Sequence, residues 1–103
     1  MKKGYLILDF SISDTQGFME YVQRIPAHIE KHGGKYIVEG MVPEILEGNW
    51  KPETIVVLEF PSKEHARAFI DDPEAEFLFD IRKNTTNSKL ILVSGGSWMD
   101  ADE

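Results

Sequence analysis

The sequence predicts an α+β fold with the element order βαββαβ, in which helices cover one face of a four-stranded antiparallel sheet. The strongest evidence is the strand signal at residues 54–62, where four consecutive apolar residues precede Glu59 and Phe60 and Pro61 ends the run. Residues 3–12 alternate between apolar and mixed positions, and a helical pattern follows each of these two stretches. Right-handed connections then favour the spatial strand order 4-1-3-2.

The composition limits the classes of protein that this chain can represent. Its 103 residues suffice for one domain with a buried core, which we place at residues 1–96, followed by a flexible acidic tail at residues 97–103. The chain has no cysteine and a formal net charge of −7, which argues against disulfides and against a nucleic-acid-binding surface. No apolar run is long enough for a leader or a membrane span, so we expect a cytoplasmic location and no membrane partner.

The first strand is expected at residues 3–12 and the first helix directly after it. Ser13 is the expected N-cap, because Gln16 lies three residues later and can complete a capping box. Pro26 lies within the helical pattern and should kink the helix or begin a second segment, and Gly33-Gly34 should end it. The stripe expected to face the core consists of Phe18, Tyr21, Val22, Ile25 and Ile29.

The later elements follow from similar signals. Gly40 is expected to mark a bend or bulge at the end of the second strand. The expected elements are a strand at 35–39 with a bent arm at 42–47, a loop at 48–52, helices at 62–70 and 74–82 with Phe77, Leu78 and Ile81 on one side, a polar turn at 84–88 and a strand at 89–94.

Helices on one face leave the other sheet face uncovered. Leu6, Leu8 and Phe10 with Val56, Leu58 and Phe60 suit the covered face, which places Tyr5, Ile7, Ile55 and Val57 on the other. Burying these four side chains would contribute roughly 1.5–3 kcal/mol each, and large exposed apolar patches are rare on monomers. We therefore expect a homodimer joined through the sheet faces.

Several short motifs resemble the family called domain of unknown function thirteen-thirty. They are His32-Gly33-Gly34-Lys35-Tyr36, Leu46-Glu47-Gly48-Asn49-Trp50, residues 56–62, Ala66-Arg67-Ala68-Phe69 and Asp72-Pro73-Glu74, and the similarity runs from about Gly4 to Gly95. The resemblance implies a ferredoxin-like dimeric α/β barrel, a superfamily that includes small monooxygenases, lactone isomerases and haem-dependent relatives. This chain departs from the family pattern at Glu39, where family members often carry a basic residue, and at Phe69-Ile70, where they often have Trp and then an aromatic residue.

Asp9 and Glu59 are the candidate catalytic residues. By strand alternation both lie on the uncovered face, but at opposite ends of antiparallel neighbours, so we do not expect them to form a dyad. Partial burial beside apolar side chains would raise a carboxyl pKa and suit a general acid or base. The alternative is that they are solvated strand ends or pair with Lys89 and Lys3, as structural ion pairs are common.

The candidate ligand-binding residues are His32, Arg82, Tyr5, Tyr36 and Trp50. Arg82 could clamp a carboxylate through its guanidinium, or could pair on the surface with Asp80 or Glu76. His28 and His32 have metal-ligand spacing, but no third ligand is evident, so no metal is expected and a helix-dipole role explains His32 equally well. The tyrosines and Trp50 could also serve only in packing.

Two functions follow as hypotheses. The first is a cofactor-independent enzyme of monooxygenase or isomerase type that acts on a small apolar or acidic molecule in a barrel cavity. The second is a non-catalytic module that binds a small ligand or regulates a partner. An RNA-recognition module has the same element order, but apolar Ile55 and Val57 stand where it needs aromatic residues, and the charge is unfavourable.

Overall fold

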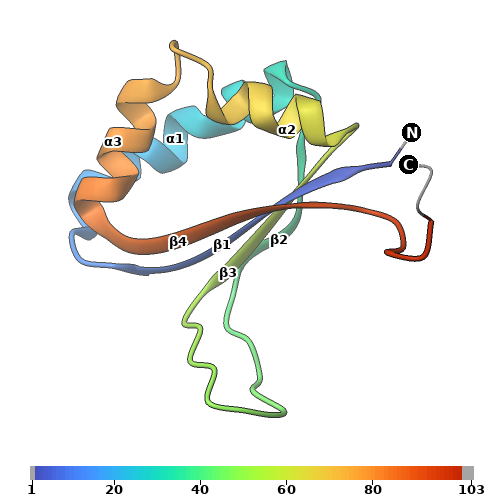
Figure 1. The fold of residues 1–103 in the computed structure, drawn as a ribbon. Coiled ribbons are helices and arrows are strands. Elements are labelled where there is room, and N and C mark those ends of the chain that lie inside the picture. The colour runs from blue at the N-terminus through green and yellow to red at the C-terminus, as the bar shows by residue number, and fades with distance from the viewer. Residues whose placement is uncertain (1, 101–103) are drawn as a thin grey trace.

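The computed structural model describes residues 2–100, which form an antiparallel sheet with helices packed on one of its faces (Figure 1). The described elements are β1 (Gly4–Ile12), α1 (Thr15–Lys31), β2 (Lys35–Met41), β3 (Ile55–Phe60), α2 (Lys63–Ile70), α3 (Glu76–Thr85) and β4 (Thr86–Ser94). The sheet order is β2-β3-β1-β4, as the right-handed connections predict. The fold is α+β and ferredoxin-like, which confirms the predicted class.

The register of the strands separates the two faces of the sheet. Leu6 lies opposite both Leu58 and Leu92, whereas Ile7 lies opposite both Val57 and Ile91. The first set faces the helices, where Leu6 and Leu58 are buried, and the second set lies on the face that no helix covers. The predicted division of β1 and β3 between the two faces is therefore confirmed.

The main core lies between the sheet and the helices. Its fully buried side chains include Phe60, Ile25 and Leu78, which come from β3, α1 and α3. Phe69 of α2 lies between β3 and α3, because the centre of its ring is 5.4 Å from that of Phe60 and 5.3 Å from that of Phe79. Burial of aromatic rings from separate elements fixes the helices against the sheet.

The start of α1 differs from the prediction. Asp14, not Ser13, is the N-cap, and its Oδ1 accepts a hydrogen bond from the backbone N–H of Gly17 at 3.0 Å. Gly17 allows this close approach, because a Cβ there would lie 2.6 Å from Asp14 Oδ2. The helix is also continuous through Pro26, so the alternative of a second helical segment is wrong.

The end of α3 is the second departure. The predicted polar turn at 84–88 does not form, because α3 runs directly into β4. Two threonine hydroxyls donate hydrogen bonds to backbone carbonyls near the end of α3. Thr85 Oγ1 donates to Ile81 O at 2.7 Å, and Thr86 Oγ1 donates to Arg82 O at 2.5 Å. Within α3, Phe79 rather than Phe77 is buried, so the predicted inward side was partly wrong.

An extended connection at residues 42–54 joins β2 to β3. It contains no regular strand, so the expected continuation of the strand at 42–47 is wrong. Figure 1 shows this connection, the arm, extending away from the side of the sheet that carries the helices. Its exposed apolar side chains are Val42, Ile45, Leu46 and Trp50.

Beyond β4, the described residues form a short turn. Met99 N–H donates to Ser97 Oγ at 3.1 Å, and residues 101–103 of the expected tail lie outside the described residues. Among the described residues, no helix is long and apolar enough to cross a membrane.

Candidate functional site

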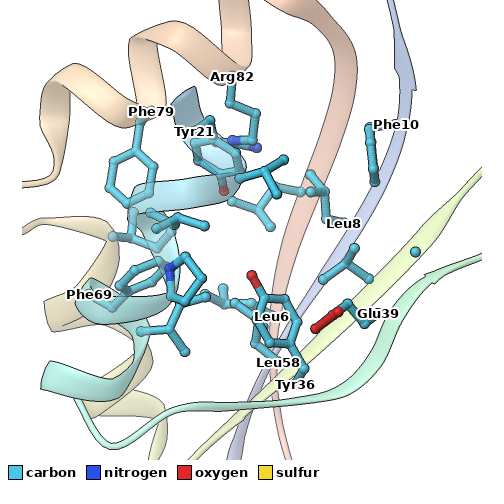
Figure 2. Close-up of a pocket in the computed structure, with 18 of the residues that line it drawn as sticks. Leu6, Leu8, Phe10, Tyr21, Tyr36, Glu39, Leu58, Phe69, Phe79 and Arg82 are labelled. Carbon is cyan, nitrogen blue, oxygen red and sulfur yellow. The ribbon is translucent and has the colours of Figure 1, made fainter. Parts of the chain in front are cut away.

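A cavity of about 220 Å³ lies between the helices and the covered face of the sheet (Figure 2). Its wall is predominantly apolar because the strands alternate and the helices turn their apolar stripes inward. Side chains from all three helices and four strands contribute, among them Leu6, Leu8, Ile25, Leu58, Phe69 and Phe79. The core is therefore not filled by its own side chains at this point.

The cavity reaches the surface between α1 and β2. Val22 and Pro26 on α1 and Glu39 and Gly40 on β2 line it and are themselves exposed. Gly40 has φ of +74°, a conformation that favours glycine, and the pairing of β2 with β3 shifts register between Glu39 and Met41. The bulge predicted at Gly40 is confirmed, and it lies at the edge of the cavity.

Four polar side chains line the cavity: Tyr21, Tyr36, Glu39 and Arg82. The hydroxyls of Tyr21 and Tyr36 point into the same space from opposite sides in Figure 2, with Arg82 beside Tyr21 and Glu39 beside Tyr36. Burial raises the pKa of Tyr36 to about 12, and the charges of Tyr21 and Glu39 add to this effect. Both tyrosines are therefore neutral near pH 7 and can donate hydrogen bonds to a ligand.

Arg82 is the cation of the site. Its side chain is only 5% exposed, and its guanidinium lies 5.8 Å from the centre of the Phe79 ring. The pKa of Tyr21 is raised by burial, and the positive charge of Arg82 opposes that rise. Arg82 Nε is buried and has no hydrogen-bond partner among the described residues. The surface ion pair with Asp80 or Glu76 considered from the sequence does not form within that part of the chain.

Only two of the five predicted ligand-binding residues, Tyr36 and Arg82, line the cavity. His32 instead contacts Asp72, with 2.8 Å between Nε2 and Oδ2, and its ring packs edge-on against Phe69. Trp50 lies on the arm and is 70% exposed. Neither of these two residues lines the cavity, although His32 packs behind its wall.

Tyr5 and the two candidate catalytic carboxylates lie on the other face of the sheet. Tyr5 OH donates to Glu59 Oε2 at 3.1 Å, and Lys35 Nζ lies 3.5 Å from Glu59 Oε1. Asp9 Oδ1 accepts the backbone N–H of Glu53 at 2.8 Å. Asp9 and Glu59 are at opposite ends of this face, as predicted, but the sheet separates both from the cavity.

No metal site is evident in the described part of the chain. Among these residues, no cluster of three or more histidine, aspartate or glutamate side chains could hold a metal ion. His28, spaced four residues from His32, has a buried Nδ1 without a hydrogen-bond partner among these residues. His32 is held by Asp72, so the metal-ligand spacing of the two histidines does not produce a site.

Sequence reasoning missed Tyr21 and Glu39 as site residues. Tyr21 was assigned to the core stripe of α1, because helical periodicity shows which side chains face inward but not whether they meet a void. Glu39 was singled out only as a departure from a family pattern. A carboxylate next to a predicted glycine bulge was the available signal, because a bulge re-aims neighbouring side chains.

The fold and the cavity define a small ferredoxin-like α+β protein with an apolar pocket between its sheet and helices. The chain belongs to the domain of unknown function family DUF1330, whose model matches residues 3–96. No curated protein matches the chain.

Several solved structures share the fold. A protein of unknown function from Rhodopseudomonas palustris is 16% identical, with a TM-score of 0.74 over 93% of this chain and 84% of that one. SnoaB, a cofactor-independent oxygenase from Streptomyces nogalater, is 13% identical, with a TM-score of 0.61 over 97% and 99%. A dimeric ferredoxin-like protein of unknown function from Thermobifida fusca is 13% identical, with a TM-score of 0.52 over 91% and 92%. At these identities the likeness shows the fold alone.

Proposed function

We propose that this protein binds a small, largely apolar molecule in the cavity between its helices and its sheet. The observation that carries the proposal is the cavity itself, about 220 Å³ within an otherwise packed core. Protein interiors contain few voids larger than a water molecule, and each such void lowers stability. A mostly apolar wall with a few convergent polar groups is typical of ligand pockets.

A second candidate is a cofactor-independent enzyme of monooxygenase or isomerase type that uses the same cavity. The fold that the chain shares with the oxygenase SnoaB favours this candidate. Glu39 is the one carboxylate among the cavity-lining residues, and it would be the base that removes a proton from a bound molecule. Tyr36 would donate a hydrogen bond to an oxygen of that molecule. Oxygen uptake with a molecule that binds, or conversion of that molecule into an isomer, distinguishes the enzyme from the non-catalytic binder.

The proposal includes a homodimer that forms through the uncovered face of the sheet. A row of apolar residues crosses all four strands of this face: Val38, Val57, Ile7 and Ile91. Ile91, on the edge strand β4, is 59% exposed in the single chain, where it lies beside Ile7 of the inner strand β1. A second copy would cover this row by two-fold symmetry. The structural neighbours described as dimeric ferredoxin-like proteins support this assembly.

The arm extends on the same side and would contact the second copy. Leu46, Val42 and Trp50 are its most exposed large apolar side chains, and a dimer would bury apolar groups of this kind. Asp9 and Glu59 flank the proposed interface, so any catalytic role for them would require a site completed by the partner subunit. Such a site would be distinct from the cavity.

A thermal-shift screen of small aromatic and aliphatic compounds tests the binding proposal, with Val56→Phe as the matched variant. Val56 lines the cavity and is half-buried, so a larger ring there should occupy the space without removing a core contact. We expect hits that raise the melting temperature of the wild type and have no effect on Val56→Phe. Compounds that stabilise both proteins equally, or a screen without any hit, would count against a cavity site.

A further inference from the structure

The cavity contains a buried cation that the described residues do not neutralise. Arg82 is 5% exposed and forms no hydrogen bond or ion pair through its side chain with any residue that the structure describes. Its guanidinium faces the Phe79 ring, with 5.8 Å to the ring centre. A cation–π contact offsets only part of the cost of taking a guanidinium out of water.

The polar groups of the cavity are arranged in order from this cation to the opening. The charge of Arg82 opposes the rise in the pKa of Tyr21, and the charges of Tyr21 and Glu39 raise the pKa of Tyr36. Tyr21 is therefore the neighbour of Arg82, and Tyr36 lies between Tyr21 and Glu39. Glu39 is exposed, so water solvates its charge. The cavity therefore has a positive, buried end and a negative, open end, and Figure 2 shows Arg82 and Glu39 on opposite sides of the apolar space.

The volume limits the size of a ligand. A cavity of about 150 Å³ holds benzene, and this one is about 220 Å³. One aromatic ring or a branched chain of similar size fits, together with a short polar group. The ring of such a ligand would lie against Leu8, Leu58 and Phe69, and its polar group would lie at Arg82.

We infer that the ligand is a small monocarboxylate with an apolar body, whose carboxylate binds Arg82 and whose body fills the cavity. This inference rests on the proposed function and specifies its ligand class. A guanidinium matches a carboxylate in two parallel hydrogen bonds, and Tyr21 OH lies on the same side to donate a third. Glu39 at the opening disfavours a second carboxylate, because two negative charges would repel.

Isothermal titration calorimetry on the full chain tests this inference with three probes: phenylacetate, its neutral analogue phenylacetamide, and the dicarboxylate 4-(carboxymethyl)benzoate, whose second carboxylate lies at the far end of the ring. The wild type should bind phenylacetate about 10-fold or more tightly than phenylacetamide, because a hydrogen bond to a charged group contributes about 1.5–3 kcal/mol. 4-(Carboxymethyl)benzoate should bind more weakly than phenylacetate, because its second carboxylate would lie toward Glu39. Equal affinity for phenylacetate and phenylacetamide would overturn the inference.

Arg82→Met and Arg82→Lys identify the residue responsible. An apolar side chain of similar length can replace a buried charge without loss of stability, so Arg82→Met should fold. It should lose the preference for phenylacetate but keep affinity for phenylacetamide, while Arg82→Lys keeps part of the preference. If Arg82→Met fails to fold, Arg82→Lys still tests the inference. An unchanged preference for phenylacetate over phenylacetamide in Arg82→Lys would contradict bidentate recognition by the guanidinium.

The result also separates this inference from the proposed function. Binding of phenylacetamide that Val56→Phe abolishes, without any preference for phenylacetate, leaves the cavity as a binding site and removes the anion site. Absence of binding by every probe contradicts both. Binding of phenylacetate that survives in Val56→Phe places the anion elsewhere on the surface and overturns the inference.

Discussion

His32 Nε2 lies 2.8 Å from Asp72 Oδ2, and this contact joins the end of α1 to the segment between α2 and α3. The same carboxylate oxygen lies 2.9 Å from Lys31 Nζ, which also contacts Glu74. Asp72 Oδ1 accepts the backbone N–H of Glu74 at 2.9 Å. Because the His32 ring packs on Phe69, this polar cluster supports one wall of the cavity from behind.

Asp72→Asn should lower the melting temperature by several degrees at pH 7 and by much less at acidic pH. Hydrogen bonds from His32 and Lys31 hold the pKa of Asp72 well below its ordinary value of 3.8. The stabilisation from the ionised carboxylate is therefore present above about pH 4, the unfolded pKa, and is lost as the pH falls through the lower folded value. Thermal unfolding at a series of pH values measures the difference.

Asp71→Asn is the matched control for Asp72→Asn. Asp71 is exposed, and among the residues that the structure describes it pairs only with Arg67, at 3.3 Å one helical turn away. A surface pair of this kind contributes little to stability, so its removal should leave the melting temperature nearly unchanged. Equal effects of the two substitutions would show that Asp72 makes no special contribution.

Tyrosine ionisation should report the environment of the cavity. The pKa values of all three tyrosines are raised, by burial at Tyr21 and Tyr36 and mainly by the hydrogen bond to Glu59 at Tyr5. An absorbance titration of phenolate formation should show one group that ionises at about pH 12, and Tyr36→Phe should remove it.

Unfolding at alkaline pH extends the same prediction. Because the folded pKa of Tyr36 is raised, its contribution to stability is intact below the unfolded value of about 10 and decreases as the pH rises toward 12. Tyr36→Phe should lose stability less steeply over this range than the wild type. A transition near pH 10 for all three tyrosines would contradict the burial of Tyr36.

Val57→Asp should convert a dimer into a monomer. Val57 lies in the central apolar row of the uncovered face, between Val38 and Ile7, where a carboxylate would be buried without a partner. Size-exclusion chromatography with light scattering should give twice the chain mass of 11.8 kDa for the wild type and the single mass for the variant.

Met19→Asp is the control for this variant. Met19 is an exposed apolar residue on α1, on the side of the molecule that carries the helices. Its replacement should leave the mass unchanged. A wild-type protein that runs as a monomer at micromolar concentration would rule out the proposed assembly.

Gly40→Ala should destabilise the protein and also alter ligand binding. Its φ of +74° is costly for any other residue, by about 1–2 kcal/mol. Within the described part of the chain, a Cβ would meet only Thr54, at 3.9 Å, so the cost is in the backbone and not in packing. Relaxation of the bulge would move Glu39 at the opening of the cavity.

Gly48→Ala provides the comparison. Gly48 on the arm has φ of +84° and open space around its Cβ position, so the backbone cost should be similar. It lies away from the cavity, and ligand affinity should not change. Denaturant unfolding and calorimetry with phenylacetate measure the two effects separately.

The order of elements, the sheet topology and the division of faces could be predicted because each depends on local periodicity. Leu6 and Ile7 differ in face by one position, and alternation determines which of them is buried. The junction of α3 with β4 could not be predicted in this way. A run of Asn and Thr residues is typical of turns, but here Thr85 and Thr86 satisfy the helix carbonyls and make a separate turn unnecessary.

The candidate site was predictable only in part. Arg82 and Tyr36 were named for their chemistry, and the structure places both in the cavity. The cavity itself depends on how closely α1 approaches the sheet, and no local pattern encodes that distance. His32 shows the converse: its motif and its helix-end position were clear, but its partner, Asp72, lies 40 residues away in the sequence.

Because α3 runs directly into β4, no loop separates the proposed ligand-binding residue on α3 from the edge strand of the sheet. Thr86, the first residue of β4, is tied to the carbonyl of Arg82 itself. Any displacement of α3 that follows a change at the guanidinium must therefore shift β4, an edge strand that would contribute to the proposed dimer interface. Ligand binding in one subunit would in this way change the position of β4 at the interface between the two subunits.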